Sequence, residues 1–143
     1  MSTRKKNTLT RRILLGLASA TLWIGTAMSP AYAAPDANAV PTGGTVAGGG
    51  VTIHNAVTDA ATNKTTMNIT QTEANGIINW DSFNVGANST VNYIQTLNGL
   101  PNTAAMTLNR VAASGGLSEI AGHINSIGTF LLINPNGVMF SQG

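Results

Sequence analysis

The sequence contains no cysteine among its 143 residues, and only 8% of them are charged. The lack of cysteine excludes a disulfide scaffold and any metal site built on thiolates. Two histidines, His54 and His123, leave little material for a histidine-based metal site. Five of the seven cations lie at or before Arg12, and after Ala33 only Lys64 and Arg110 remain, against five acidic residues. Because nucleic-acid binding requires a positive surface patch, this composition argues against a nucleic-acid partner.

The segment from Met1 to Ala33 shows the order of parts that is typical of a secretory signal peptide. A basic stretch precedes an uncharged apolar run at residues 13–28, and small residues stand two apart at Ala31 and Ala33. The run is short for a transmembrane helix and is interrupted by glycine, serine and threonine. We therefore expect cleavage after Ala33 and passage through the Sec translocon. The pair Arg11–Arg12 is also similar to a twin-arginine signal, which is the alternative route.

The remaining chain has the pattern of short strands and turns. Residues 34–50 are rich in glycine and proline and are expected to form an extended lead-in and the start of a domain. From residue 51 onward, short segments alternate apolar and polar residues between Gly, Asn, Ser or Pro, and no stretch sustains a helical repeat. These expected strands lie at 51–53, 66–70, 78–80, 83–85, 91–93, 106–108, 120–124, 130–133 and 138–140.

Short strands of this kind fit a sandwich, a barrel or a solenoid. The short strands, the Asn- and Thr-rich turns that suit side-chain ladders, and an end at Gly143 close after a strong strand favour the solenoid. The sequence therefore predicts an all-β fold, a stub of right-handed parallel β-helix with short extra-helical strands. At about 20 residues per coil it would make roughly four or five coils. The core is expected to comprise Ile78, Trp80, Phe83, Val85, Val91, Met106, Leu108, Ile120, Ile124, Phe130, Leu132 and Phe140.

One tetrapeptide, Asn134-Pro135-Asn136-Gly137, follows the apolar run at residues 129–133. Proline restricts φ to the narrow range that the second position of a turn requires, and asparagine and glycine suit the positions after it. The four residues therefore predict a sharp turn between two buried strands. Taken alone, this turn signal is generic.

Five motifs follow one another in a definite order along the chain, and the last of them contains this turn. They are Gly76–Gly86 (GIINWDSFNVG), Thr90–Gln95 (TVNYIQ), Leu108–Val111 (LNRV), Ser118–Gly122 (SEIAG) and Gly128–Phe140. Together with residues 41–44 and 68–71, they resemble the amino-terminal secretion domain, or TPS domain, of filamentous-haemagglutinin-type exoproteins. These exoproteins are the TpsA proteins of Gram-negative two-partner secretion. The resemblance covers roughly residues 40–143.

The sequence departs from the family pattern in three places. Tyr93 stands where the family usually has phenylalanine, only one Asn-Pro-Asn segment is present, and the chain ends where members continue much further. Residues 51–143 are accordingly interpreted as a carboxy-terminally truncated TPS secretion domain.

The resemblance implies a route and a set of partners. Family members cross the inner membrane by the Sec route and stay extended in the periplasm. They engage an outer-membrane TpsB-type β-barrel through its POTRA domains and then fold at the cell surface. The expected location is thus secreted or cell-surface. The residues expected to carry transporter recognition or folding are Asn79, Trp80, Asn109, Arg110, Asn134, Pro135, Asn136 and Gly137.

Six of these eight residues also have a plainer interpretation. The tetrapeptide is explained by turn chemistry alone, Arg110 by an ordinary solvated surface position, and Trp80 by the core or the edge of a coil. His54 and His123 fit surface or polar-ladder positions.

Two other classes of function compete with secretion. An enzyme would need clustered carboxylates or a recognisable triad, and the acidic residues are scattered singly, so we expect no catalysis and no cofactor. The alternative is a stand-alone secreted adhesin or carbohydrate-binding module that uses asparagines, Trp80 and Tyr93. The effector activity of a longer protein, whether adhesin, haemolysin or contact-dependent toxin, is not encoded in these residues.

Overall fold

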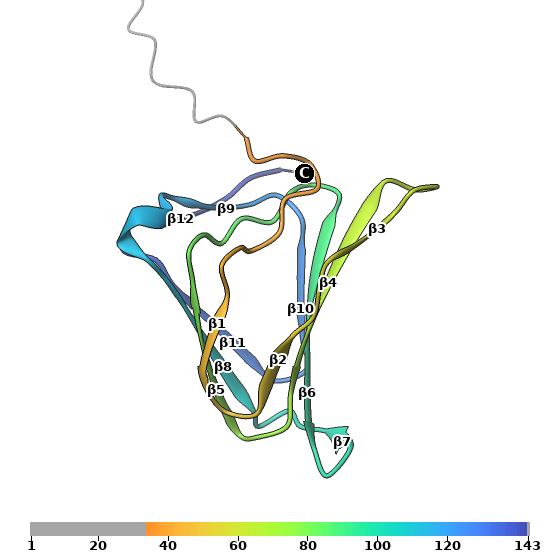
Figure 1. Ribbon diagram of the computed structural model, residues 1–143, viewed down its shortest axis with the longest axis vertical. Helices are drawn as coiled ribbons and strands as arrows, with labels where there is room; N and C mark the ends of the chain where they lie inside the picture. The colour runs from red at the N-terminus through yellow and green to blue at the C-terminus, as the bar shows by residue number, and fades with distance from the viewer. Residues whose placement is uncertain (1–33, 143) are drawn as a thin grey trace, which may run out of the picture. The chain divides into compact units, whose positions relative to one another are not determined.

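Three parallel sheets form the sides of a β-helix in the computed structural model, which describes residues 34–142 (Figure 1). The first side contains β4 (Lys64–Gln71), β6 (Ser89–Leu97) and β10 (His123–Ser126). The second side contains β5 (Asn75–Trp80), β8 (Met106–Val111) and β11 (Thr129–Ile133). The third side pairs β9 (Ser118–Ile120) with β12 (Val138–Phe140), and Val85 bridges to Ile120 in parallel. The predicted all-β parallel β-helix is confirmed, and the predicted signal peptide with Ala31 and Ala33 lies outside the described residues.

The described chain makes three coils, so the expectation of four or five was wrong. The second coil is long because it contains β7 (Leu100–Pro101), which pairs with the end of β6, and the 3-10 turn η1 (Ala113–Gly115). The expected strand at 120–124 is divided between β9 and β10, with a corner at Gly122. A Cβ at Gly122 would overlap the carbonyl oxygens of Gly86 and Ser89, so the corner requires glycine.

The segment before the first coil runs antiparallel to it and covers its edge. β1 (Thr45–Gly48) pairs with β5, and β2 (Val51–Ile53) and β3 (Val57–Asp59) pair with β4. Thr42 adds an antiparallel bridge to Ser82. At the other end, β10, β11 and β12 are the last strands of their sheets within the described residues. The edge of the first coil is therefore covered by strands of the same domain.

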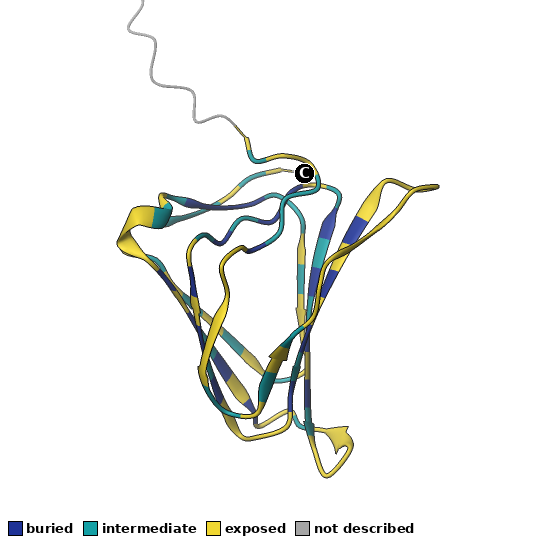
Figure 2. Ribbon diagram, viewed as in Figure 1, coloured by how far each residue is buried: buried dark blue, intermediate teal, exposed yellow. Residues whose placement is uncertain are grey.

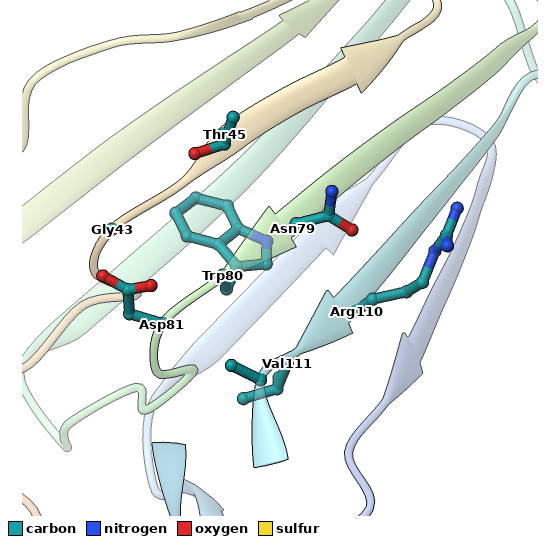
Figure 3. Close-up of a pocket in the computed structure, with 8 residues that line it drawn as sticks. Gly43, Thr45, Asn79, Trp80, Asp81, Arg110 and Val111 are labelled. Atoms are coloured by element: carbon teal, nitrogen blue, oxygen red, sulfur yellow. The ribbon is translucent and has the colours of Figure 1, made fainter. Parts of the chain in front are cut away.

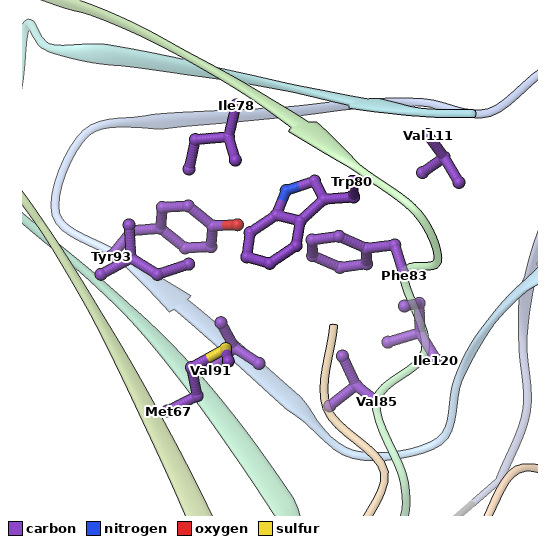
Figure 4. Packing of buried hydrophobic residues seen from close by; sticks show 10 residues of the cluster. Met67, Ile78, Trp80, Phe83, Val85, Val91, Tyr93, Val111 and Ile120 are labelled. Atoms are coloured by element: carbon purple, nitrogen blue, oxygen red, sulfur yellow. The ribbon is translucent and has the colours of Figure 1, made fainter. Parts of the chain in front are cut away.

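The core lies inside the coils, where alternate residues of each strand point inward (Figures 2 and 4). Trp80 packs edge-on against Phe83 with ring centroids 5.7 Å apart, and Phe130 packs against Tyr93 at 5.0 Å. Burying about ten apolar side chains supplies the main driving force for coil formation. The buried apolar cluster comprises Met67, Ile69, Ile78, Trp80, Phe83, Val85, Val91, Tyr93, Val111 and Ile120.

Of the residues that were expected in the core, Ile124, Phe130 and Leu132 are half-buried and pack against the buried cluster, and three others do not pack against it. Met106 and Phe140 are exposed, by 41% and 78%, and Leu108 is half-buried. In β8 the inward positions belong to Thr107 and Asn109, because the parallel register places them beside the buried Gly76 and Ile78 of β5. The prediction failed at β8 because it assumed that the apolar residues face inward, whereas hydrogen bonds stabilise polar side chains inside the coil.

Candidate functional site

The eight residues predicted for recognition lie at the carboxyl ends of three neighbouring strands. Asn79 and Trp80 end β5, Asn109 and Arg110 lie near the end of β8, and the tetrapeptide 134–137 directly follows β11. Asn79 lies beside Arg110, and Arg110 lies beside Ile133, the last residue of β11. Parallel pairing therefore brings together three motifs that are distant from one another in the sequence.

The tetrapeptide forms the predicted turn between β11 and β12. The Gly137 amide donates to the Asn134 carbonyl at 3.0 Å, and the Asn136 amide donates to Asn134 Oδ1 at 2.8 Å. Gly137 has φ of 95°, a value that favours glycine. The predicted turn is present, but the two strands that it joins are not buried as expected, since every residue of β11 and β12 is half-buried or exposed.

Both asparagine side chains of the turn also bind the coil before it. Asn134 Nδ2 donates to the Gly116 carbonyl and to Ser118 Oγ, each at 2.8 Å. Asn136 Nδ2 donates to the Ala113 carbonyl at 2.7 Å. These hydrogen bonds hold the turn against the corner that precedes β9. Both asparagines therefore stabilise the contact between two coils, a role that a turn signal alone does not predict.

Asn109 is fully buried and joins the inward-facing side chains of three strands. Its Oδ1 accepts hydrogen bonds from Trp80 Nε1 at 2.9 Å and from the Tyr93 hydroxyl at 2.7 Å. Its Nδ2 donates to the Leu131 carbonyl at 3.1 Å. Burial raises the pKa of Tyr93 well above its usual value, and the hydrogen bond to Asn109 only partly opposes this. Tyr93 therefore stays protonated and acts as a donor.

Asn79 and Arg110 point outward, in contrast to Trp80 and Asn109. They border a cavity of about 270 Å³ beside the start of β1 (Figure 3). Trp80 forms part of its wall, with Asp81 and Arg110 on opposite sides of the indole (Figure 3). The wall consists of Gly43, Thr45, Asn79, Trp80, Asp81, Arg110, Val111 and Ala112. The four predicted residues on β5 and β8 are therefore divided between an inner pair, Trp80 and Asn109, and an outer pair, Asn79 and Arg110.

Two sets of polar side chains link strands of the β-helix, whereas the sequence predicted asparagine and threonine ladders only in the turns. Inside the corner between the first and second sides, Gln95 Nε2 donates to Thr107 Oγ1 at 2.9 Å, and Thr107 Oγ1 donates to Gln71 Oε1. On the outer surface of the first side, one asparagine of each coil hydrogen-bonds to the next. The sequence does carry a signal for this second set, since the segments TMNIT (66–70), TVNYI (90–94) and HINSI (123–127) all have asparagine at the third position, directly after an apolar residue.

Neither a metal site nor a membrane-spanning helix is found in the described residues. No group of three or more His, Cys, Asp or Glu side chains within residues 34–142 is placed to hold a metal ion. No helix in this part of the chain is long and apolar enough to cross a membrane.

Comparison with known families identifies the domain. The family model described as the TPS secretion domain matches residues 37–143. The chain belongs to this family. The TPS domain is a secretion module of TpsA-type exoproteins, which are secreted with the help of a partner transporter. The resemblance drawn from the five ordered motifs is thus confirmed.

Relatives of this TPS domain include much longer proteins. A heme/hemopexin-binding protein of Haemophilus influenzae is 36% identical over 92 residues, which is 64% of this chain and 9% of the relative. A protein of the same description from strain Rd is 36% identical over 77 residues, or 54% of this chain and 8% of the relative. The chain spans less than a tenth of the length of these relatives.

A solved structure shares the fold of this TPS domain. The crystal structure of the HMW1 secretion domain from Haemophilus influenzae superposes with a TM-score of 0.54 and 32% identity. The superposition covers 71% of this chain and 23% of the HMW1 chain. The similarity in both sequence and fold agrees with the β-helix described above.

Proposed function

We propose that this TPS domain is recognised as an extended chain by the POTRA domains of an outer-membrane TpsB-type β-barrel and folds only after it has crossed that membrane. Passage through the Sec translocon and the periplasm precedes this step. The burial of two recognition residues is the observation that carries the proposal. Asn109 and Trp80 are 0% and 2% exposed in the fold. A transporter that reads them has to do so before the coils close around them.

The shape of the extended chain suits this mode of recognition. Strands that alternate side chains, such as β4 and β6, can add to the edge of a partner sheet through their backbone groups. With no cysteine in the chain, no disulfide closes the polypeptide before it is threaded through a pore. Most residue contacts in the fold join distant parts of the sequence, which is typical of slowly folding proteins.

The covered edge of the first coil supports a role in starting coil formation at the cell surface. Strands β1, β2 and β3 pair antiparallel with this coil, so no parallel coil can be added before it. A domain whose first coil is covered in this way is suited to nucleate a β-helix that grows in a single direction.

The stand-alone carbohydrate-binding alternative loses its main support in this fold. Such a module would present aromatic rings on its surface, but Trp80 and Tyr93 are each 2% exposed. Both rings contribute to the core, and both donate their polar hydrogen to Asn109.

Co-expression with and without the cognate transporter tests the proposal. The full chain, with its leader, is expressed in a Gram-negative host, and its amount in the medium and on the cell surface is measured. We expect it outside only when the barrel is present, and inside the periplasm otherwise. A barrel that lacks its POTRA domains is the matched control and should fail like no barrel at all. Equal export in all three strains would contradict the proposal.

A further inference from the structure

Asn109 forms side-chain hydrogen bonds with one residue in each of the three coils. Its Oδ1 accepts from Trp80 of the first coil and from Tyr93 of the second, and its Nδ2 donates to the Leu131 carbonyl of the third. A buried amide is stable when both its oxygen and its nitrogen have hydrogen-bond partners. The surroundings of Asn109 are therefore complete only after all three coils have formed.

The third coil also supplies the side chain that covers Asn109. The neighbours of Asn109 in register on the second side are Ile78 of β5 and Leu132 of β11. All three side chains point inward, so Leu132 covers the side of Asn109 that faces away from the first coil. Asn109 is 0% exposed with β11 in place, and without β11 this side of the amide would face solvent.

Trp80 is surrounded by residues that precede the third coil. It packs edge-on against Phe83 of its own coil, and its Nε1 donates to Asn109 of the second coil. Its register neighbour is Val111 on β8. In the segment before the first coil, a Cβ on Gly44 would overlap the indole ring. The two buried recognition residues are thus covered at different stages, Trp80 by the second coil and Asn109 by β11.

The tetrapeptide 134–137 holds β11 in this covering position. It directly follows β11, and its two asparagine side chains donate three hydrogen bonds to the segment 113–118 of the second coil. The end of a strand frays readily where few contacts hold it. These hydrogen bonds lie next to the end of β11 that carries Leu132, so they stabilise the strand where it covers Asn109.

We propose that the transporter stays bound to Asn109 after Trp80 is buried, and that it releases the domain when β11, held by the tetrapeptide, covers Asn109. This inference rests on the proposed recognition of the extended chain and adds the order in which the recognition residues become inaccessible. Each coil of a β-helix contacts only its neighbours, so the third coil can open while the first two stay closed. Residues 134–137 therefore control release through Asn109, without contacting the transporter themselves.

Refolding of the purified chain from urea tests the order of burial. At successive times one sample is offered to the isolated POTRA domains, and a second is pulse-labelled by hydrogen exchange to follow the amides of β5 and β11. We expect capture to persist after the β5 amides are protected and to end when the β11 amides are protected. Capture that ends with the protection of β5 would overturn the inference, and so would simultaneous protection of the two strands.

Asn134→Ala tests the role of the tetrapeptide in the folded chain. The variant loses two hydrogen bonds to the second coil, so the protection of the β11 amides from exchange should fall by about threefold or more. The protection of β5 should stay unchanged, and the POTRA domains should capture the folded variant faster than the parent chain by the same factor. Asn55→Ala, at an exposed position outside the strands, is the matched control and should change neither quantity. If Asn134→Ala does not fold, Asn136→Ala, which loses only the hydrogen bond to Ala113, replaces it with the same expectations.

The outcomes separate this inference from the proposed function. Unchanged protection of β11, an equal loss of protection in β5 and β11, or a loss confined to β11 without faster capture would each overturn the inference. All of these results leave recognition of the extended chain intact. A chain that is never captured, even directly after dilution from urea, would refute the proposed function and this inference with it.

Discussion

The Tyr93 hydroxyl donates a 2.7 Å hydrogen bond to Asn109 Oδ1 across the interior of the β-helix, linking β6 on the first side to β8 on the second. Trp80 Nε1 donates to the same oxygen from β5. A single buried amide thus joins two aromatic side chains that would otherwise place unsatisfied donors in the core. This arrangement holds two sides of the β-helix at a fixed separation.

Replacing Asn109 with leucine should strongly destabilise the domain. The change removes the acceptor of two buried donors, and each unsatisfied donor costs roughly 1–3 kcal/mol. We expect the free energy of unfolding to fall by about 2–5 kcal/mol in urea titrations of the purified chain. The neighbouring Arg110→Leu variant, which is exposed, is the control and should change it by less than about 1 kcal/mol. Similar losses in the two variants would contradict the role assigned to Asn109.

Alkaline pH should destabilise the domain through Tyr93. Burial raises its pKa in the folded state above the value of about 10 in the unfolded chain. Above that pH the unfolded chain releases the phenolic proton while the folded state retains it, so stability falls as pH rises. The contribution of this group is full below about pH 10 and declines by up to about 1.4 kcal/mol per pH unit above it. A Tyr93→Phe variant should lose this pH dependence, and parallel decline of both proteins would refute the assignment.

Two variants of the tetrapeptide separate its structural role from recognition. Asn134→Ala removes hydrogen bonds to Gly116 and Ser118 and should lower the free energy of unfolding by about 1–3 kcal/mol. Pro135→Ala changes an exposed residue and should cost under about 1 kcal/mol. Both stability and transporter-dependent secretion are measured. If secretion follows stability, the turn acts through folding; a secretion defect in Pro135→Ala with stability unchanged would instead show direct recognition.

Adjacent residues of β11 distinguish folding-driven export from recognition of the extended chain. Leu132 points inward and packs on the core, whereas Ile133 points outward and is 56% exposed. Leu132→Asp places a charge in the core and should prevent folding, while Ile133→Asp should be tolerated. If folding outside biases the movement outward, only Leu132→Asp stalls export, as judged by protease accessibility at the cell surface. Export of both variants at the wild-type level would show that folding does not drive the movement.

Much of the fold could be predicted from period-two patterns, because strands such as β4 and β5 alternate cleanly. The prediction of which side chains face the core was wrong at β8, where Met106 and Leu108 face outward while Thr107 and Asn109 face inward. Hydrophobicity alone favours the opposite orientation, and only the hydrogen-bonding partners across the interior reverse it. Those partners are Gln71 on β4 and Tyr93 and Gln95 on β6, so their position depends on how the first side of the β-helix faces the second.

The sequence alone could not show how the fold divides the residues of the candidate site between the interior and the surface. The sequence indicated two adjacent pairs, Asn79 with Trp80 and Asn109 with Arg110, and it gave no reason to expect different roles for the two members of a pair. Because successive side chains of a strand point to opposite faces, one member of each pair points inward and the other points outward. Short extra-helical strands were predicted, and β2 is the expected strand at 51–53, but the antiparallel pairing of β1, β2 and β3 with the first coil was not predicted, because alternation within a segment does not say which strand it pairs with.

Binding of the purified domain to the isolated POTRA domains of its transporter, measured for the unfolded and the folded chain, tests the central claim most directly. Chain diluted from urea and captured before it folds should bind, and chain allowed to fold fully should not, because Asn109 and Trp80 are then buried. Equal binding by the folded domain would contradict recognition in the extended state.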